Sequence, residues 1–528
     1  MAGVQLGPGI LVCLLFLVTC LVAAVWSYLR PSGGADGGRA AVIPSPPALP
    51  FIGNLHQLGK GRHHRTLHEL ARRHGPLFQL RLGSVRALVV SSAPVAEAVL
   101  RNKDHVFCGR PQQRTARGTL YDCRDVAFSP YGERWRRLRR IAVVHLLSAR
   151  RVDSFRALRE EEVASFVGRI RAASGGVVNV TELVVGLTNT VVSRAAFGKK
   201  LGGLDPAKVR ETVGELANLL ETIAVSDVFP RLRWVDWASG LDARMKRTAA
   251  KLDEVLEMAL RDHEQSLGND DGEARDLMDD LLHIVNDDGG GGGGHGYKLD
   301  MIDVKGFILD MFVAGTDTIY KSIEWTMAEL IKNPSEMAKV QAEVRHVART
   351  HGVGGDNAVA VVHEEQLGKM ALLRAAMKEA MRLHPPVPLL IPRESVQDTE
   401  LHGYHIPAKT RVMINAWAIG RDEAAWENAG EFRPERFVSG GGGDGAGVDY
   451  QGGKDHCDFR FIPFGAGRRG CPGVAFGTRL AELVLANIVC HFDWELADGQ
   501  DVGTFEVVES SGLSPGLVNP LVLAAKPL

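Results

Sequence analysis

The chain has 528 residues, of which 45% are hydrophobic and 24% are charged, a composition that favours a globular protein with a large core over a disordered one. Lys and Arg number 62 and Asp and Glu 63, so the net charge indicates neither a nucleic-acid-binding protein nor an acidic tail. The seven cysteines are odd in number and have no paired spacing, which argues against a disulfide framework and indicates a reducing compartment.

An uncharged apolar run over residues 10–29 is the first predicted element. A helix of this length spans about 30 Å, the thickness of a bilayer core. The alternative is a cleaved signal peptide, but such a peptide has a basic start and an apolar stretch of only about 7–15 residues, whereas residues 1–9 carry no charge. Arg30 and Arg39 follow the run, which places the rest of the chain in the cytosol. We therefore predict an N-terminal single-pass transmembrane helix within residues 1–30.

Residues 31–50 are rich in Gly and then in Pro, and we expect them to form a linker and hinge that orients the body against the membrane. Gly-rich stretches at residues 289–294 and 440–453 predict surface loops. Motifs with chemical significance fall on both sides of each loop, so neither loop separates two domains. Residues 51–528 are therefore expected to form one domain.

Apolar residues recur at three- and four-residue steps from residue 301 to 332, and Asn333-Pro334 stops the pattern, which predicts one long helix. Alternating runs at residues 76–82 and 87–90 predict strands of a small sheet. Much of the remaining chain has helical periodicity. The expected fold class is mainly α with minor β.

Residues 464–473 read F-G-A-G-R-R-G-C-P-G. The glycines give this turn conformational freedom, so it can present the Cys471 sulfur and let a flat macrocycle lie over it. A helix that begins just after Cys471 would favour the thiolate through its amide donors and its positive end. A cysteine that falls in a Gly-rich turn by chance is the alternative, but every position of a ten-residue pattern is met here.

This pattern resembles the haem-binding signature of the cytochrome P-450 family, Phe-x-x-Gly-x-Arg-x-Cys-x-Gly, which is matched by Phe464, Gly467, Arg469, Cys471 and Gly473. The resemblance implies a haem b cofactor with Cys471 as the axial ligand of the iron and Arg469 as the partner of a haem propionate. A thiolate ligand favours cleavage of the O–O bond.

Glu379 and Arg382 lie three residues apart on a predicted helix, where their side chains can meet. Alone, this is a common solvated pair. Followed by P-E-R-F at residues 434–437, it resembles the Glu-x-x-Arg motif of the family, with Arg436 as the third partner. The resemblance implies a structural charge network buried behind the haem.

Trp135 and Arg139 in W-R-R-L-R resemble a family element that pairs haem propionates, and Arg393 resembles a further propionate contact. The other arginines of residues 134–140 have two interpretations. They form either a solvated basic face or a docking surface for an acidic flavoprotein reductase. The sequence leaves both open.

Within the predicted long helix, residues 314–318 read A-G-T-D-T. Thr and Asp inside a helix can bond local backbone or water, and Ala-Gly leaves room for a small molecule; a cap or a kink is the alternative. The segment resembles the oxygen-activation motif of the family, which implies that Thr318 stabilises dioxygen at the iron and that Asp317 relays protons. Ile319 departs from the Ser or Thr that many members have next.

The motifs together resemble the plant microsomal group that oxidises specialised metabolites. This implies a cytochrome P-450 catalytic domain over residues 51–528 at the cytosolic face of the endoplasmic reticulum. It would insert one atom of O2 into a lipophilic small molecule, with electrons from NADPH through a cytochrome P-450 reductase. By family position, substrate would contact residues 108–128, 311–315, 387–391 and 510–513, although core packing explains their apolar character equally well.

Two other classes of function compete with this one. A haem-thiolate isomerase or dehydratase would rearrange an oxygenated substrate, and dependence on NADPH discriminates it. A membrane haem carrier or electron-transfer protein would not be an enzyme, and turnover of any substrate excludes it. Neither class needs an oxygen motif, so Gly315, Asp317 and Thr318 favour the monooxygenase.

Overall fold

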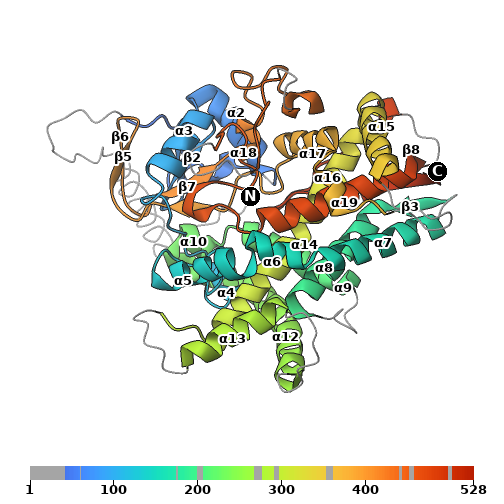
Figure 1. Cartoon of the computed structure of the whole chain (residues 1–528). Helices are drawn as coiled ribbons and strands as arrows, with labels where there is room; N and C mark the ends of the chain where they lie inside the picture. Colours follow the sequence, from blue (N-terminus) through green and yellow to red (C-terminus); the bar gives the residue numbers. More distant parts are fainter. Residues whose placement is uncertain are drawn as a thin grey trace, which may run out of the picture.

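The computed structural model describes residues 42–528 except residues 60, 174–175, 199–205, 267–275, 290–296, 352–360, 439–442, 451–456 and 498–501 (Figure 1). The predicted membrane anchor and most of the linker lie outside the described residues. Of the second Gly-rich loop, residues 443–450 are described and form a turn.

The longest helix of the described chain, α14 (Met301–Lys332), runs through the middle of the molecule (Figure 1). Asp300 accepts hydrogen bonds from the N–H groups of the first turn, and the Asp303 side chain accepts one from the Asp300 N–H, which forms a capping box. The helix ends before Pro334, where a new helix, α15 (Pro334–His351), begins. The predicted long helix is confirmed at both ends.

Three helices pack against α14 and share one hydrophobic core with it: α8 (Val180–Phe197), α17 (Ala371–Leu383) and α19 (Val474–His491). Within the described residues, α19 alone is long and apolar enough to cross a membrane, but 78% of this stretch is buried inside the protein. Its apolar character is therefore explained by core packing. The first turns of α19 lie close to α14, since a Cβ at Gly477 would be 3.6 Å from Ile319.

A four-stranded sheet has the order β1-β2-β7-β4. Both predicted strands are confirmed as the antiparallel pair β1 (Leu77–Leu82) and β2 (Val85–Val90). β2 also pairs in parallel with β7 (Arg411–Ile414), and β7 pairs antiparallel with β4 (Arg393–Glu394). The sheet thus joins the first and last thirds of the described chain and brings Arg393 to its edge.

The other helices and strands surround these elements (Figure 1). β3 (Val177–Asn179), β9 (Val522–Pro527) and β8 (Phe492–Leu496) form a second sheet in that order, and β5 (Thr399–Leu401) and β6 (Tyr404–Ile406) form a hairpin. The remaining helices are α2 (His63–His74), α3 (Ala93–Glu97), α4 (Arg114–Thr119), α5 (Glu133–Ile141), α6 (Ala149–Ser154), α7 (Arg156–Ala172), α9 (Pro206–Glu221), α10 (Val225–Val228), α11 (Arg233–Ala238), α12 (Leu241–Ser266), α13 (Leu277–Gly289), α16 (Glu364–Leu367) and α18 (Ala416–Ile419). The described chain is therefore mainly α with minor β, as predicted.

Candidate functional site

Cys471 lies in a loop, residues 464–473, that leads into α19. Its N–H donates to Phe464 O (2.9 Å), which closes the loop. Cys471 is the only exposed cysteine among the described residues, yet protein surrounds it, so the thiol faces an internal hollow. Burial raises the pKa of this thiol, while a hydrogen bond from the Gly473 N–H and the charge of Arg139 act in the opposite direction.

Glycine is required at two positions of this loop. Gly465 and Gly467 have φ angles of +66° and +69°, in the left-handed region that other residues rarely adopt. A Cβ at Gly467 would also lie 2.4 Å from Leu100 O, so this position admits no side chain without movement. At Gly473 a Cβ would meet the Cys471 sulfur at 3.9 Å, an ordinary contact, and packing does not require glycine there.

Arg469 is a half-buried residue of this loop. Its guanidinium donates to three backbone oxygens, those of Cys108 (2.9 Å), Val126 (3.3 Å) and Ser129 (2.7 Å). It stacks 4.2 Å from the centre of the Trp135 ring, whose Nε1–H donates to Val126 O (3.1 Å). Burial, reinforced by neighbouring positive charge, lowers the pKa of Arg469 to about 9.

Arg393 and Arg139 add further positive charge near Arg469. Arg393 pairs with Asp104 (3.0 Å) and donates to Ala466 O (2.7 Å), and burial lowers its pKa. Burial also lowers the pKa of Arg139. In the described part of the chain, Asp104 is the only carboxylate that bonds to any of these three arginines. The surplus of buried positive charge fits the two carboxylates of a haem, and the thiol in its glycine turn fits the iron and the flat ring.

Thr318 lies on a stripe of α14 that faces an internal hollow. Its Oγ1–H donates to Ala314 O (2.8 Å) one turn earlier, a bond that Thr commonly makes inside a helix. Ala314 is exposed and Thr318 is half-buried, although both lie in the central helix. The stripe is therefore open to a small molecule next to the hydroxyl.

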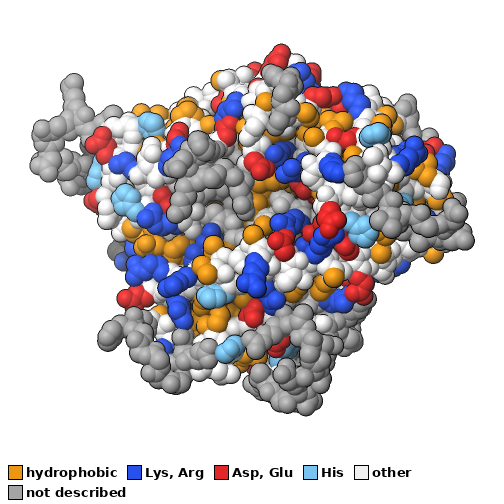
Figure 2. Space-filling view, in the orientation of Figure 1, with side chains coloured by type: hydrophobic (Ala, Val, Ile, Leu, Met, Phe, Trp, Pro, Cys, Tyr) orange, Lys and Arg blue, Asp and Glu red, His pale blue; other side chains and the backbone are white. Residues whose placement is uncertain are grey.

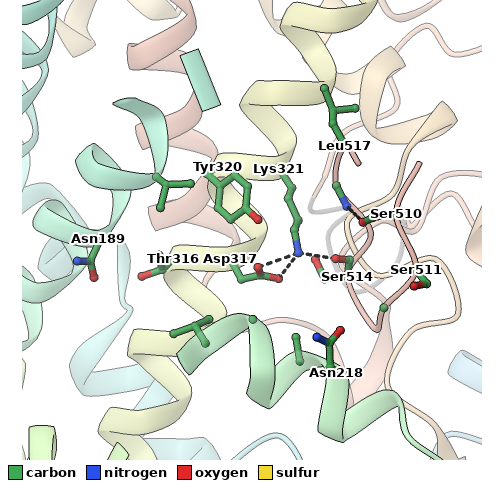
Figure 3. A pocket seen from close by; sticks show the side chains of 16 residues that line it. Asn189, Asn218, Thr316, Asp317, Tyr320, Lys321, Ser510, Ser511, Ser514 and Leu517 are labelled. Carbon is green, nitrogen blue, oxygen red and sulfur yellow. Dashed lines mark hydrogen bonds and ion pairs between the residues drawn. The ribbon is translucent and has the colours of Figure 1, made fainter. Parts of the chain in front are cut away.

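Asp317 points away from this stripe, into a cavity of about 260 Å³ between α8, α9, α14 and residues 510–517 (Figure 3). Lys321 Nζ lies 2.7 Å from Asp317 Oδ1 and also donates to Ser514 O, so the buried carboxylate is ion-paired. Thr318 does not line this cavity. The structure therefore does not bring the Asp317 carboxylate and the Thr318 hydroxyl together.

Sequence reasoning missed Lys321. A lysine four residues after an aspartate on a helix can form an ion pair with it, and this spacing was the signal that could have found it. The hydroxyls of Thr316 and Ser514 are buried in the same cavity without a hydrogen-bond partner among the described residues. Residues 510–512, which were predicted to contact substrate, also line this cavity.

The structure brings Glu379, Arg382 and Arg436 into one buried network. Glu379 Oε1 lies 2.7 Å from Arg382 Nη2 and 2.9 Å from Arg436 Nε, and all three residues are at most 4% exposed. Arg382 also donates to the backbone oxygens of Gly420 and Ala429. The network thus ties α17 to the loop that follows α18.

The comparisons with known proteins agree with this geometry. Residues 43–516 match the family model described as Cytochrome P450. The chain is similar to Cytochrome P450 71A1 of Persea americana, with 46% identity over 90% of this chain and 91% of the relative. It is also similar to norfluorocurarine oxidase of Strychnos sp, with 42% identity over 91% of each chain. A solved zebra fish cytochrome P450 with progesterone superimposes with a TM-score of 0.71 at 25% identity, covering 88% of this chain and 99% of that one.

We expect Arg382→Ala to lose about 3–5 kcal/mol of folding free energy, because it leaves the buried charge of Glu379 short of a partner. Thermal unfolding of the purified protein measures this loss. Lys526→Ala is the control. Its pair with Glu495 is exposed on both sides and should contribute at most about 1 kcal/mol. Equal unfolding midpoints for the two variants would contradict a structural role of the network.

Proposed function

The chain belongs to the cytochrome P450 family and is a monooxygenase of the plant specialised-metabolism type, and from this basis we propose the reaction that its site performs. The protein inserts one atom of O2 into a lipophilic plant metabolite and releases the other atom as water. A separate flavoprotein reductase supplies the electrons from NADPH. The observation that carries the proposal is the Cys471 sulfur, which a glycine turn presents to a hollow at the start of α19.

In this proposal Cys471 ligates the iron of haem b, and Arg469, Arg139 and Arg393 bind its propionates. When bound, haem with a thiolate ligand supplies the activation of dioxygen. Trp135 acts on the cofactor indirectly, because its Nε1–H is taken by the backbone and its ring stacks on Arg469. Phe464, Gly467 and Gly473 shape the turn around the sulfur.

Thr318 and Asp317 are the proposed proton-transfer groups. The Thr318 oxygen can accept a hydrogen bond from water in the hollow and pass a proton at Oγ1. The hydroxyls of Thr316 and Ser514, which have no hydrogen-bond partner among the described residues, suit ordered water in the cavity of about 260 Å³ next to the Asp317 carboxylate. Protons would enter from this cavity, and Asp317 would turn away from Lys321 to deliver them.

The proposed location is the endoplasmic reticulum membrane. Residues 1–30 would be the anchor, residues 31–50 the linker, and residues 51–528 the catalytic domain in the cytosol. Two exposed tryptophans on α11 support a surface that meets the bilayer, since Trp234 is 65% and Trp237 73% exposed. Indole rings prefer the interface between lipid and water.

The proposed electron donor is an NADPH-dependent cytochrome P450 reductase that docks on α5. Lys and Arg side chains gather over this helix (Figure 2). Arg136 and Arg140 are exposed there, whereas Arg134 donates to the Tyr297 hydroxyl (2.9 Å). An exposed basic surface attracts the acidic surface of a flavoprotein partner.

We expect Cys471→Ala to abolish the haem-thiolate centre, because Cys471 is the only exposed cysteine among the described residues and the only one of them in the glycine turn. The reduced carbon monoxide spectrum of the purified protein measures this. Cys457→Ala, at a partly buried cysteine outside the loop, should keep the wild-type spectrum. A thiolate-type Soret band that survives in Cys471→Ala would overturn the assignment.

We expect Thr318→Val to keep the fold and the haem but to divert electrons from NADPH to hydrogen peroxide. Proton-transfer groups typically contribute about 10²–10⁴-fold to rate, and a water that replaces the hydroxyl would soften the loss. Product formed per NADPH is the measurement. Thr326→Val is the matched control, because Thr326 makes the same bond to the carbonyl one turn earlier but lies in the core. If both variants match wild type, Thr318 is a structural residue.

Deleting residues 1–30 should release the protein from membranes and leave its haem bound, because the described site begins far beyond them. Membrane fractionation and the reduced carbon monoxide spectrum of the soluble fraction test the two halves of this prediction. A truncated protein that stays in the membrane pellet would contradict the role of these residues as the anchor. Loss of all folded holoprotein in detergent would show that they also build the body.

A further inference from the structure

Two acidic side chains near the arginines are not used by any of the motifs described above. Asp125 is fully buried in the segment of residues 124–128, which precedes α5. Asp310 lies on α14, on the same stripe as Ala314 and Thr318 but nearer the start of the helix, and is half-buried. Buried carboxyl groups are costly in free energy, so their bonds indicate what they do.

The two carboxyl groups bind consecutive N–H groups of this segment. Asp310 Oδ2 accepts hydrogen bonds from the N–H of Val126 (2.6 Å) and from the N–H of Ala127 (3.0 Å). Asp125 Oδ1 accepts one from the N–H of Phe128. Asp310 therefore fastens the segment to α14, a helix that follows it by more than 170 residues.

The carbonyl groups of the same segment hold the side chains that surround the Cys471 loop. Val126 O accepts hydrogen bonds from Trp135 Nε1 (3.1 Å) and Arg469 Nη1 (3.3 Å). Ala127 O accepts one from Arg110 Nε (2.8 Å). A continuous series of bonds thus leads from Asp310, through the backbone, to Trp135 and Arg469.

Two arginines lie near the carboxyl groups of Asp125 and Asp310. Arg110, which is buried, and Arg469, which is half-buried, donate to backbone oxygens, so neither neutralises a carboxylate through a direct bond. Burial raises the pKa of Asp125 to about 6, and burial together with the charge of Asp125 raises the pKa of Asp310 well above its ordinary value. Burial therefore favours the uncharged form of Asp310, whose carbonyl oxygen can still accept both N–H bonds.

We propose that Asp310 is a positioning residue that pins residues 124–128 to α14 and thereby fixes the side chain of Arg469, in the Cys471 loop, and that of Trp135 next to it. Asp125 stabilises the same segment by accepting a hydrogen bond from the Phe128 N–H. That Arg469 binds a haem propionate rests on the proposed function. The pinning of the segment does not rest on it, because the hydrogen bonds of Asp310 to Val126 and Ala127 carry it; Arg124, at the start of the segment, also pairs with Asp300 and Asp303 near the start of α14.

The test compares Asp310→Leu with Asp310→Asn in the purified holoprotein. Leucine has a similar volume but accepts no hydrogen bond, whereas the asparagine oxygen still accepts from both N–H groups and resembles the protonated carboxyl. Amide hydrogen exchange of a peptide that covers residues 124–128 is the readout. We expect exchange at least about tenfold faster in Asp310→Leu and within about threefold of wild type in Asp310→Asn, since the lost bonds leave two partly buried N–H groups without an acceptor.

Haem retention gives a second readout of the same variants. Asp310→Leu should lose haem on gel filtration and convert more readily to the form without thiolate ligation, and Asp310→Asn should behave as wild type. If Asp310→Leu does not accumulate, Asp310→Ser takes its place in the comparison. Exchange of residues 124–128 should again be faster than in Asp310→Asn. Unchanged exchange in Asp310→Leu or Asp310→Ser would overturn the proposal. Faster exchange in Asp310→Leu, combined with a haem-loaded wild-type protein that forms no product, would uphold the pinning and count against the proposed function instead.

Discussion

A guanidinium group taken out of water needs an acceptor for its N–H groups and a negative charge nearby, because its desolvation costs several kcal/mol. Two clusters of arginines near the candidate site meet this requirement in different ways. Arg382 and Arg436 share Glu379, and Arg436 also pairs with Asp444, so this cluster is neutralised within the chain itself. Arg469 and Arg139 bond to no carboxylate of the described residues, and the proposed haem would supply the missing charge. The first cluster is therefore complete within the fold, whereas the second one would depend on the proposed cofactor.

Polar residues of the central helix also need hydrogen-bond partners. Three polar groups on α14 find them in different ways: Thr318 through a carbonyl of its own helix, Asp317 through Lys321, and Asp310 through backbone N–H groups of residues 124–128. Because successive residues of a helix point about 100° apart, these groups face different spaces. One helix can thus adjoin the hollow near Cys471, line a second polar cavity and anchor a neighbouring loop.

Local features of the site could be predicted from the sequence because they depend on neighbours along the chain. The limits of α14 follow from apolar periodicity and from a proline that begins the next helix. The turn around Cys471 follows from glycines at fixed offsets, two of which adopt left-handed backbone angles. The meeting of Glu379 with Arg382 follows from their three-residue spacing on one helix.

Only the tertiary structure decided which distant residues pair with one another and which way each side chain points. No local pattern pairs β2 with β7, or Arg393 with Asp104, because such pairs form only when the whole core packs. Asp317 and Thr318 are neighbours in the sequence and belong to one predicted motif. In the folded chain, Asp317 lines the cavity between α8, α9 and α14, whereas Thr318 does not. The sequence by itself thus determined the fold class, the thiol-bearing turn and the family, whereas tertiary packing decided which charges are neutralised and which remain for a ligand.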